Sequence, residues 1–270
     1  MKIVFMGTPE FSKPILEALI KNYDVELIVT QPDRVLGNKV SEPIIKKVGL
    51  MNNIKVFQPQ KIRKEYEEII NLNPDMIITC AYGQIIPKAL LDCPKYGAIN
   101  IHASLLPKLR GGAPIHHAII DGYDKTGITI MYMNDKMDEG DIIMQRETII
   151  TDDDTTETLH DRLSIIGRDL ILEAIPKIIS GDIKRIKQNE EDVTYGYNIF
   201  NNKILKIWKS RIGSEKKGTI GEIVNIYDDG FGVICADGEI ILTEVQLEGK
   251  KKQTAREFIN GHQLIGSILK

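Results

Sequence analysis

The chain has 270 residues, of which 42% are hydrophobic and 27% charged, with a formal net charge of -3 at pH 7. These values are typical of one large or two modest globular domains. The slightly negative charge excludes nucleic-acid binding by overall charge, so such a partner would need a local basic patch. No segment approaches the roughly 18 apolar residues of a membrane span, so we expect no membrane partner.

Cysteine usage indicates the compartment. The three cysteines, Cys80, Cys93 and Cys235, show no CxxC spacing, and two of them lie in apolar runs. Met1–Met6 turns into Gly7-Thr-Pro-Glu10 too early for the apolar region of a signal peptide. We therefore expect free thiols and a reducing, cytoplasmic setting.

Strand-like and helix-like segments alternate through the first 180 residues. Pro14 in the first turn and Ser12 as a plausible N-cap mark the start of the first helix. The alternation predicts a Rossmann-like, doubly wound, mainly parallel sheet with helices on both faces. The expected strands are 2–6, 26–30, 55–57, 75–81, 98–102, 127–133 and 141–147, and the expected helices are 13–20, 43–50, 63–72, 113–120 and 155–179.

The pattern changes near the C-terminus. Strands are expected at 219–226, 232–236 and 239–245, joined by Asp228-Asp-Gly230 and Asp237-Gly238, and Asp-Gly between apolar runs is a strong hairpin signal. Thr254-Ala-Arg-Glu257 is a capping box that opens a short last helix. We predict a catalytic domain at 1–182, a linker at 183–203, and a small open, OB-like β-barrel domain at 204–270.

Two polar side chains near the end of an expected strand form the best candidate site. In Ala98-Ile-Asn-Ile-His102, Asn100 and His102 share one face because side chains alternate with period 2. Ligands of open α/β sheets bind beyond the carboxyl ends of the strands. Asp138 lies in a loop between two later strands and can return to the same edge. A lone histidine is more often a core residue, and the neighbours of His102 bring the catalytic and structural interpretations to equal weight.

Other motifs point away from cofactors. Gly7-Thr8 resembles a phosphate-binding turn, but neither the G-x-G-x-x-G nor the Walker pattern is present. We interpret it as a tight strand-to-helix turn and expect no nicotinamide or nucleoside triphosphate site. The histidines and acidic residues show no metal-ligand spacing, so we expect no metal. Arg34 and Arg110 each either hold an anion or cap a carbonyl.

Basic residues crowd into one short segment. Six cations and Trp208 fall within 15 residues that contain one acid, Glu215. A solvated basic segment and a stripe that contacts phosphates are equally good interpretations, since each phosphate contact would release counterions. The cations are Lys203, Lys206, Lys209, Arg211, Lys216 and Lys217.

Several motifs together resemble the folate-dependent formyltransferases over nearly the whole chain. They are Met1–Phe11, Gln31-Pro-Asp-Arg34, Ala81–Pro87, Asn100–Pro107, Arg110–Pro114, Met137–Asp141, Thr194-Tyr195, Leu247–Lys251 and Glu257–Gly261. The resemblance is greatest to the branch that acts on initiator tRNA. It implies transfer of the formyl group of 10-formyltetrahydrofolate to the amino group of methionine carried by that tRNA.

The resemblance also assigns residues. It implies that Asn100, His102 and Asp138 are catalytic, with the first two stabilising the oxyanion and Asp138 paired with His102. It implies that folate is bound by Ser104, Leu105, Leu106 and Pro107, with Tyr82, Gly83, Gln84, Ile85 and Ile86 lining the same pocket. The second domain would hold tRNA, and we expect a monomer.

Two departures from the family concern the acceptor. The loop 35–43 is shorter and less basic than is usual, and the second domain lacks an Arg…Pro-x-Pro-Gly segment. The closest alternative is therefore a formyltransferase acting on another amine, such as a nucleotide-linked amino sugar. A different class, a binding protein without catalysis, is disfavoured because Asn100, His102 and Asp138 are all present.

Overall fold

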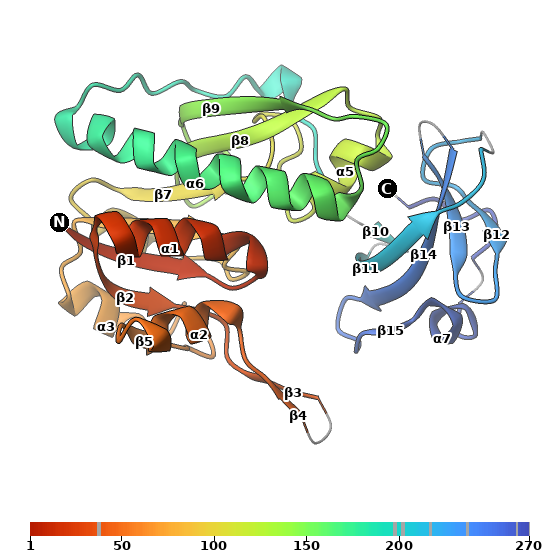
Figure 1. Ribbon diagram of the computed structural model, residues 1–270, viewed down its shortest axis with the longest axis horizontal. Coiled ribbons are helices and arrows are strands. Elements are labelled where there is room, and N and C mark those ends of the chain that lie inside the picture. Colours follow the sequence, from red (N-terminus) through yellow and green to blue (C-terminus); the bar gives the residue numbers. More distant parts are fainter. Residues whose placement is uncertain are drawn as a thin grey trace. The chain divides into compact units, whose positions relative to one another are not determined.

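The computed structural model describes residues 1–36, 39–196, 199–200, 203–215, 218–235, 238–262 and 264–269 (Figure 1). The chain divides into two compact units. Unit 1 comprises Met1–Arg110, Thr126–Ile149 and Glu157–Thr194, and unit 2 comprises Gly111–Lys125, Ile150–Thr156 and Tyr195–Lys270. The domains expected from the sequence are continuous segments, whereas this division also assigns two short segments of the first 160 residues to unit 2.

Unit 1 is built on a seven-stranded sheet with the order β5-β2-β1-β6-β7-β8-β9. The first five strands in this order pair in parallel, and β8 joins β7 antiparallel. The mainly parallel sheet expected from the β–α alternation is confirmed. The strands are β1 (Lys2–Gly7), β2 (Asp24–Val29), β5 (Lys55–Phe57), β6 (Met76–Cys80), β7 (Ala98–His102), β8 (Lys125–Tyr132) and β9 (Ile142–Ile149).

Helices cover both faces of this sheet (Figure 1). On one face, α6 (Thr156–Ser180) packs closely on the sheet and on α1 (Lys13–Asn22). A Cβ at Gly167 of α6 would lie 3.2 Å from Ile101 of β7 and 3.4 Å from Ile15 of α1. On the other face, α3 (Glu67–Asn71) and α4 (Lys88–Asp92) contribute Ile69 and Leu90 to a core that includes Val4 and Ile77. The doubly wound architecture follows from these two apolar layers. The remaining helix of unit 1 is α2 (Ile44–Met51).

The strand order reverses between β1 and β6, which creates the crevice where ligands of such folds bind. Gly7 ends β1, and a Cβ there would lie 3.0 Å from the Cys80 carbonyl oxygen, so the two strand ends approach closely. Ser12 precedes α1 at the expected N-cap position but makes no side-chain cap. Its hydroxyl instead donates to the Cys80 carbonyl at 2.6 Å, which fastens the start of α1 to the end of β6.

Unit 2 contains a six-stranded sheet with the path β10-β11-β14-β13-β12, and β15 pairs with β14. All its described pairings are antiparallel, as expected for the β-rich second domain. Its core includes Leu205, Phe231, Val245 and Phe258. Its elements are α5 (Pro114–Ile120), β10 (Ile199–Phe200), β11 (Lys203–Ile212), β12 (Ile223–Ile226), β13 (Phe231–Cys235), β14 (Gly238–Leu247), β15 (Gln253–Thr254) and α7 (Ala255–Ile259).

The Asp228–Gly230 turn and the last capping box are confirmed, whereas the expected cap by Ser12 is not. Tyr227 and Gly230 exchange backbone hydrogen bonds of 2.8 and 3.3 Å, which closes the β12–β13 hairpin. The capping box of Thr254 and Glu257 is present with both of its hydrogen bonds. Asp237 of the second Asp-Gly turn lies outside the described residues. The expected helix 63–72 begins later, at Glu67, because the preceding residues form turns.

The short loop 35–43 forms part of a hairpin of β3 (Arg34–Leu36) and β4 (Lys39–Ser41). Gly37 and Asn38, between the two strands, lie outside the described residues. No helix within the described ranges is long and apolar enough to span a bilayer. None of Cys80, Cys93 and Cys235 is joined in a disulfide in the part of the chain that the structure describes.

Candidate active site

Asn100 lies near the carboxyl end of β7, directly opposite Thr79 of β6 in the parallel register. The Thr79 hydroxyl is buried and its shortest hydrogen bond, 2.8 Å, is donated to Asn100 Oδ1. A hydroxyl has one hydrogen to donate, and the amide oxygen is the acceptor of an asparagine. This contact therefore turns the Asn100 NH2 group away from β6. The NH2 group lies 3.5 Å from Asp138 Oδ1.

His102 ends β7 and is 6% exposed. Its Nε2 lies 2.9 Å from the backbone carbonyl oxygen of Leu109. A carbonyl can only accept, so Nε2 carries the hydrogen, and Nδ1 is the nitrogen whose protonation changes. Nδ1 lies 3.7 Å from Asp138 Oδ1. The imidazole is thus held at one nitrogen by backbone and presents the other to a carboxylate.

Asp138 arrives from the loop between β8 and β9, as its position in the sequence suggested. Its Oδ1 is the atom on which both Asn100 Nδ2 and His102 Nδ1 converge, and its side chain is 15% exposed. Separations of 3.5 and 3.7 Å exceed the distances of strong hydrogen bonds. Neither Asn100 Nδ2 nor His102 Nδ1 is therefore held by a short hydrogen bond to Asp138. The structure brings the three predicted catalytic side chains together at the carboxyl edge of the sheet.

The turn Ser104–Pro107 follows β7 and is held by its own hydrogen bonds. The Ser104 hydroxyl donates 2.6 Å to the Lys108 carbonyl. Leu106 is 3% exposed, its backbone N–H donates to the Thr129 hydroxyl at 3.0 Å, and its carbonyl accepts from Gln145. Of the four residues predicted to bind folate here, only Leu105 and Pro107 have partly exposed side chains. Ser104 and Leu106 support the turn.

The loop Tyr82–Ile86 follows β6, next to the turn at the end of β1. The Tyr82 carbonyl accepts from the Thr8 hydroxyl and from Gln31 Nε2, both at 3.0 Å. Burial, with the nearby Glu65 carboxylate, raises the pKa of the Tyr82 phenol. The side chains of Tyr82 and Ile86 are buried at 4% and 7% exposure, whereas Ile85 is 60% exposed.

Two further members of that loop have different surroundings. Gly83 is exposed and has a φ of 86°, in the left-handed region that favours glycine. The side chain of Gln84 accepts from the Ile62 N–H at 2.9 Å, which ties the loop to the segment before α3. The exposed surface of this loop is therefore made by Ala81, Gly83 and Ile85.

The guanidinium of Arg110 is paired with acidic and amide side chains of unit 1. Its side chain is fully buried, and its guanidinium contacts Glu190 at 2.9 Å and Glu139 at 3.7 Å. Its Nε donates 3.0 Å to the Gln188 side chain. These partners satisfy a buried cation, whose removal from water is otherwise costly. The side chain of Arg34 lies outside the described side chains.

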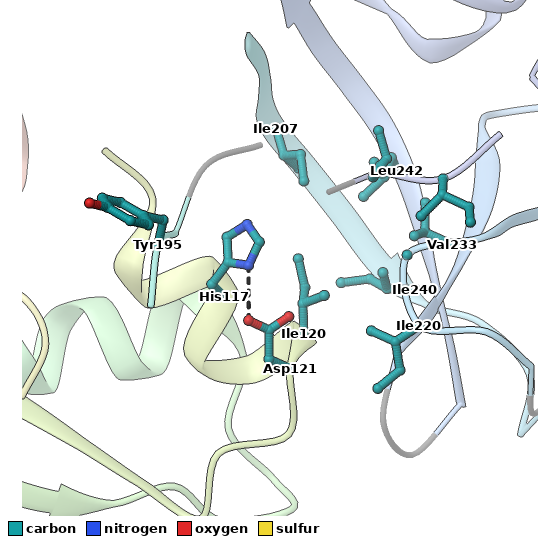
Figure 2. Close-up of a pocket in the computed structure, with 12 residues that line it drawn as sticks. His117, Ile120, Asp121, Tyr195, Ile207, Ile220, Val233, Ile240 and Leu242 are labelled. Carbon is teal, nitrogen blue, oxygen red and sulfur yellow. Dashed lines mark hydrogen bonds and ion pairs between the residues drawn. The ribbon is translucent and has the colours of Figure 1, made fainter. Parts of the chain in front are cut away.

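A separate pocket lies within unit 2 and has a volume of about 290 Å³. Figure 2 shows His117 on α5 and Asp121 just after that helix, joined by a contact of 3.1 Å, with apolar side chains including Ile207 and Ile240 around the pocket. None of the predicted catalytic or folate-binding residues lines it. In the part of the chain that the structure describes, no group of three or more His, Cys, Asp or Glu is arranged to hold a metal.

Sequence reasoning missed the residues that orient the site. Thr79 could have been found, because parallel neighbours near their carboxyl ends lie side by side. Gln188 and Thr194 act through contacts between distant segments, for which the sequence carries no local signal. Leu109 lies in the turn that follows His102, and its role depends on how that turn folds back.

Two models of known protein families match the chain. The model "Formyl transferase" matches residues 1–175, and the model "Formyl transferase, C-terminal domain" matches residues 194–263. The methionyl-tRNA formyltransferase of Geobacillus sp. (strain WCH70) is 44% identical, covering 100% of this chain and 98% of the relative. The methionyl-tRNA formyltransferase of Bacillus subtilis (strain 168) is 43% identical, covering 99% and 97% respectively.

A solved structure supports the fold. The N-formyltransferase from Helicobacter canadensis, in complex with folinic acid and dTDP-3-aminofucose, aligns with a TM-score of 0.60 at 19% identity. The alignment covers 90% of this chain and 98% of that one. Both family models and the full-length identities to methionyl-tRNA formyltransferases show that this chain belongs to the formyl transferase family.

Proposed function

We propose that this chain transfers the formyl group of 10-formyltetrahydrofolate to the amino group of methionine on initiator tRNA. The observation that carries the proposal is the convergence of Asn100, His102 and Asp138 within 3.7 Å at the end of β7. The full-length identity to methionyl-tRNA formyltransferases supports this acceptor. The relatives of the amino-sugar class are similar at the level of fold, at 19% identity in the example above.

In the reaction, the lone pair of the neutral amine attacks the formyl carbon, and the carbonyl electron pair moves onto oxygen. The Asn100 NH2 group, oriented by Thr79, donates to that oxyanion. A protonated His102 donates from Nδ1 to the same oxygen, since Nε2 is held by Leu109. Preorganised donors of this kind typically lower the barrier by about 3–4 kcal/mol each.

Asp138 completes the proton balance. Its carboxylate stabilises the imidazolium of His102 by opposite charge. It also accepts the proton that the attacking amine loses, directly or through a water, and returns it to the folate nitrogen as the carbon–nitrogen bond breaks. The amine is thereby formylated, and tetrahydrofolate leaves with its nitrogen protonated.

Two loops that flank the strand ends would hold the folate. Ile85, Leu105 and Pro107 supply partly exposed apolar surface. The buried Tyr82, Ile86, Ser104 and Leu106 support these loops from beneath, and Gly83 and Gln84 complete the first loop. Apolar walls with a few polar groups are typical of sites for ligands of this size. No metal takes part in this proposal.

The acceptor sets the expected setting of the enzyme. Initiator tRNA is used by the translation machinery, so we propose that the chain acts in the cytoplasm, as a monomer. The second domain, residues 204–270 after a linker at 183–203, would supply contacts to tRNA. The strand β11 spans the start of this proposed domain.

The decisive experiment is a transfer assay with purified protein, 10-formyltetrahydrofolate, and either charged initiator tRNA or a nucleotide-linked amino sugar. Mass spectrometry of the acceptor should show formylmethionine on the tRNA and no change in the sugar. Formylation of the sugar alone would overturn the proposed acceptor. Absence of transfer to either acceptor, with the protein folded, would overturn the proposed reaction.

A substitution of His102 tests its assignment as a catalytic residue. We expect His102→Ala to lower kcat about 100- to 1000-fold, which is the usual cost of one lost oxyanion donor. The dissociation constant for 10-formyltetrahydrofolate, measured by fluorescence titration, should change little. A kcat within a few-fold of the unmodified enzyme would show that His102 is not catalytic.

A further inference from the structure

A short segment of unit 1, residues 188–194, contacts both loops that hold the proposed catalytic groups. We call this segment the strap. It contains a single 3-10 turn, Glu190–Asp192, and has a polar side chain directed at the active-site loops at each end. Its two ends are Gln188 and Thr194.

Gln188 holds the loop that carries Asp138. Its Nε2 donates to the backbone carbonyl of Asp138 at 2.7 Å and to that of Gly140 at 2.9 Å. Its Oε1 accepts from Arg110 Nε at 3.0 Å. Both amide hydrogens and the amide oxygen are thus engaged, so the side chain is fixed in one orientation.

The Asp138 loop needs such support. Asp138 has a φ of 53°, in the left-handed region that residues with a Cβ seldom adopt. Backbone of this kind persists only where the surroundings hold it. Two hydrogen bonds from one side chain hold the carbonyl of this residue and that of Gly140, and the Asp138 carboxylate lies 3.7 Å from His102.

Thr194 holds the backbone that orients His102. Its hydroxyl accepts from the Leu109 N–H at 2.9 Å, and its carbonyl accepts from the Arg110 N–H at 2.9 Å. Leu109 also has a positive φ, 57°, and its carbonyl is the group that accepts from His102 Nε2. Thr194 therefore holds two consecutive peptide N–H groups on either side of the Leu109 carbonyl.

The contacts made by Gln188 and by Thr194 both affect the distance between His102 and Asp138. His102 and Asp138 are 3.7 Å apart, so a small displacement of either loop changes whether they interact. Buried Arg110 links the two ends, since its backbone contacts Thr194 and its side chain contacts Gln188.

We propose that Gln188 and Thr194 are positioning residues. Through them, the strap sets the distance between His102 and Asp138, and it determines which imidazole nitrogen of His102 carries the hydrogen. The kinetic part of this inference rests on the proposed function. A spectroscopic measurement that needs no substrate tests the rest.

The first test removes the donors of Gln188. Gln188→Ala and the nearly isosteric Gln188→Glu both lose the two N–H bonds to the Asp138 loop. We expect kcat to fall 10- to 100-fold, as for lost supporting contacts in other active sites, while KM for both substrates stays within two-fold. Unchanged kcat in a folded variant of either kind would overturn the role of Gln188. A rise in KM with unchanged kcat would overturn it as well.

The second test removes the Thr194 hydroxyl, which accepts a hydrogen bond from the Leu109 N–H. Thr194→Val removes the hydroxyl at constant shape, and Thr194→Ser keeps it. In the unmodified protein, nitrogen-15 NMR should show that the neutral form of His102 carries its hydrogen on Nε2, the signal being assigned from the spectrum of His102→Ala. We expect Thr194→Val to give a mixture of the two tautomers and a 10- to 100-fold lower kcat, and Thr194→Ser to restore both. An unchanged tautomer in Thr194→Val would overturn the role of Thr194 even if no acceptor were formylated.

Asn189 provides the matched control. It lies in the strap, but its side chain contacts only Glu191 and Asp192 within it. Asn189→Ala should leave kcat within two-fold and the His102 tautomer unchanged. A loss equal to that of Gln188→Ala would mean that general loosening of the segment, rather than specific positioning, explains the effect, and would overturn the proposal.

Discussion

At the scale of single residues, the orientation of two proposed catalytic groups depends on one neighbour each. Thr79 turns the amide of Asn100, and the Leu109 carbonyl fixes the imidazole of His102. These neighbours do not touch the proposed reacting atoms. They determine which hydrogens face the substrate, which is the part of catalysis that must be organised in advance.

The role of Thr79 is directly testable. Thr79→Val keeps the shape and removes the hydroxyl, so the Asn100 amide loses the contact that fixes its oxygen. We expect kcat to fall about ten-fold, which corresponds to about 1.4 kcal/mol, the value of a typical buried hydrogen bond. Thr79→Ser, which keeps the hydroxyl, serves as the control and should stay close to the unmodified enzyme. Equal kcat values for the two variants would contradict the assignment.

At the scale of elements, β14 carries a buried acid that is held by neutral hydrogen-bond donors. Glu239 is 4% exposed and accepts from the Tyr227 hydroxyl at 2.7 Å, the Ser214 hydroxyl at 2.8 Å and Asn225 Nδ2 at 3.0 Å. The absence of a side chain at Gly232, on the paired strand, makes space for the Glu239 carboxylate, because a Cβ there would overlap it. A network in which the donors fully surround a carboxylate can stabilise its ionised form.

The sign of the pH dependence follows from this network. Burial raises the pKa of Glu239, but the hydrogen bonds from Tyr227, Ser214 and Asn225 together hold it below its usual value. A lowered pKa in the folded state contributes stability above the unfolded value of about 4.3, and this stability is lost as the pH falls through the folded pKa.

We expect Glu239→Gln to destabilise unit 2 by about 1–3 kcal/mol at neutral pH, because an amide NH2 would replace an acceptor. The loss of stability below about pH 4 should also become less steep. Urea unfolding monitored by the single tryptophan, Trp208 in β11, reports on this unit. Glu222→Gln, on a half-buried acid for which no such network is seen, is the control. Parallel pH–stability curves for Glu239→Gln and the unmodified protein would refute the argument.

At the scale of the whole molecule, a net charge of -3 gives no general attraction to tRNA. The basic segment on β11 is partly neutralised. Lys209 contacts Glu244 at 2.7 Å, and Arg211 contacts Asp229 at 2.8 Å through two hydrogen bonds. Lys206 is exposed, and no ion pair of it is seen among the described residues. Lys216 and Lys217 lie outside the described residues.

The structure therefore distinguishes cations of this segment that are already paired with acids from Lys206, a difference that the sequence does not reveal. If the segment contacts phosphates of tRNA, Lys206→Ala should lower the slope of log affinity against log salt by about 0.7–0.9. Arg211→Ala should lower it less, because Asp229 already neutralises that cation. Filter binding of initiator tRNA at several salt concentrations measures both slopes. An unaltered slope in Lys206→Ala would leave this side chain as a solvated charge.

Local patterns accounted for the parallel sheet of unit 1 and for the core of the candidate site, but β11 of unit 2 was not among the expected strands. Strand periodicity placed Asn100 and His102 on one face, and the alternation of elements predicted that the Asp138 loop would return to the same edge. The fate of Arg110 could not be predicted. Its partners Gln188 and Glu190 lie 78 and 80 residues away, and a cation in a loop shows no sign of full burial until the chain is folded.

The sequence by itself determined the class of each unit and the residue types of the candidate site, because hydrophobic period, turn chemistry and capping are properties of a few consecutive residues. The tertiary structure alone decided which hydrogen faces the site, which predicted folate residues are buried, and which cations are already paired. Those outcomes depend on hydrogen bonds and packing between segments far apart in the chain, and these contacts exist only once the sheet and its loops have assembled.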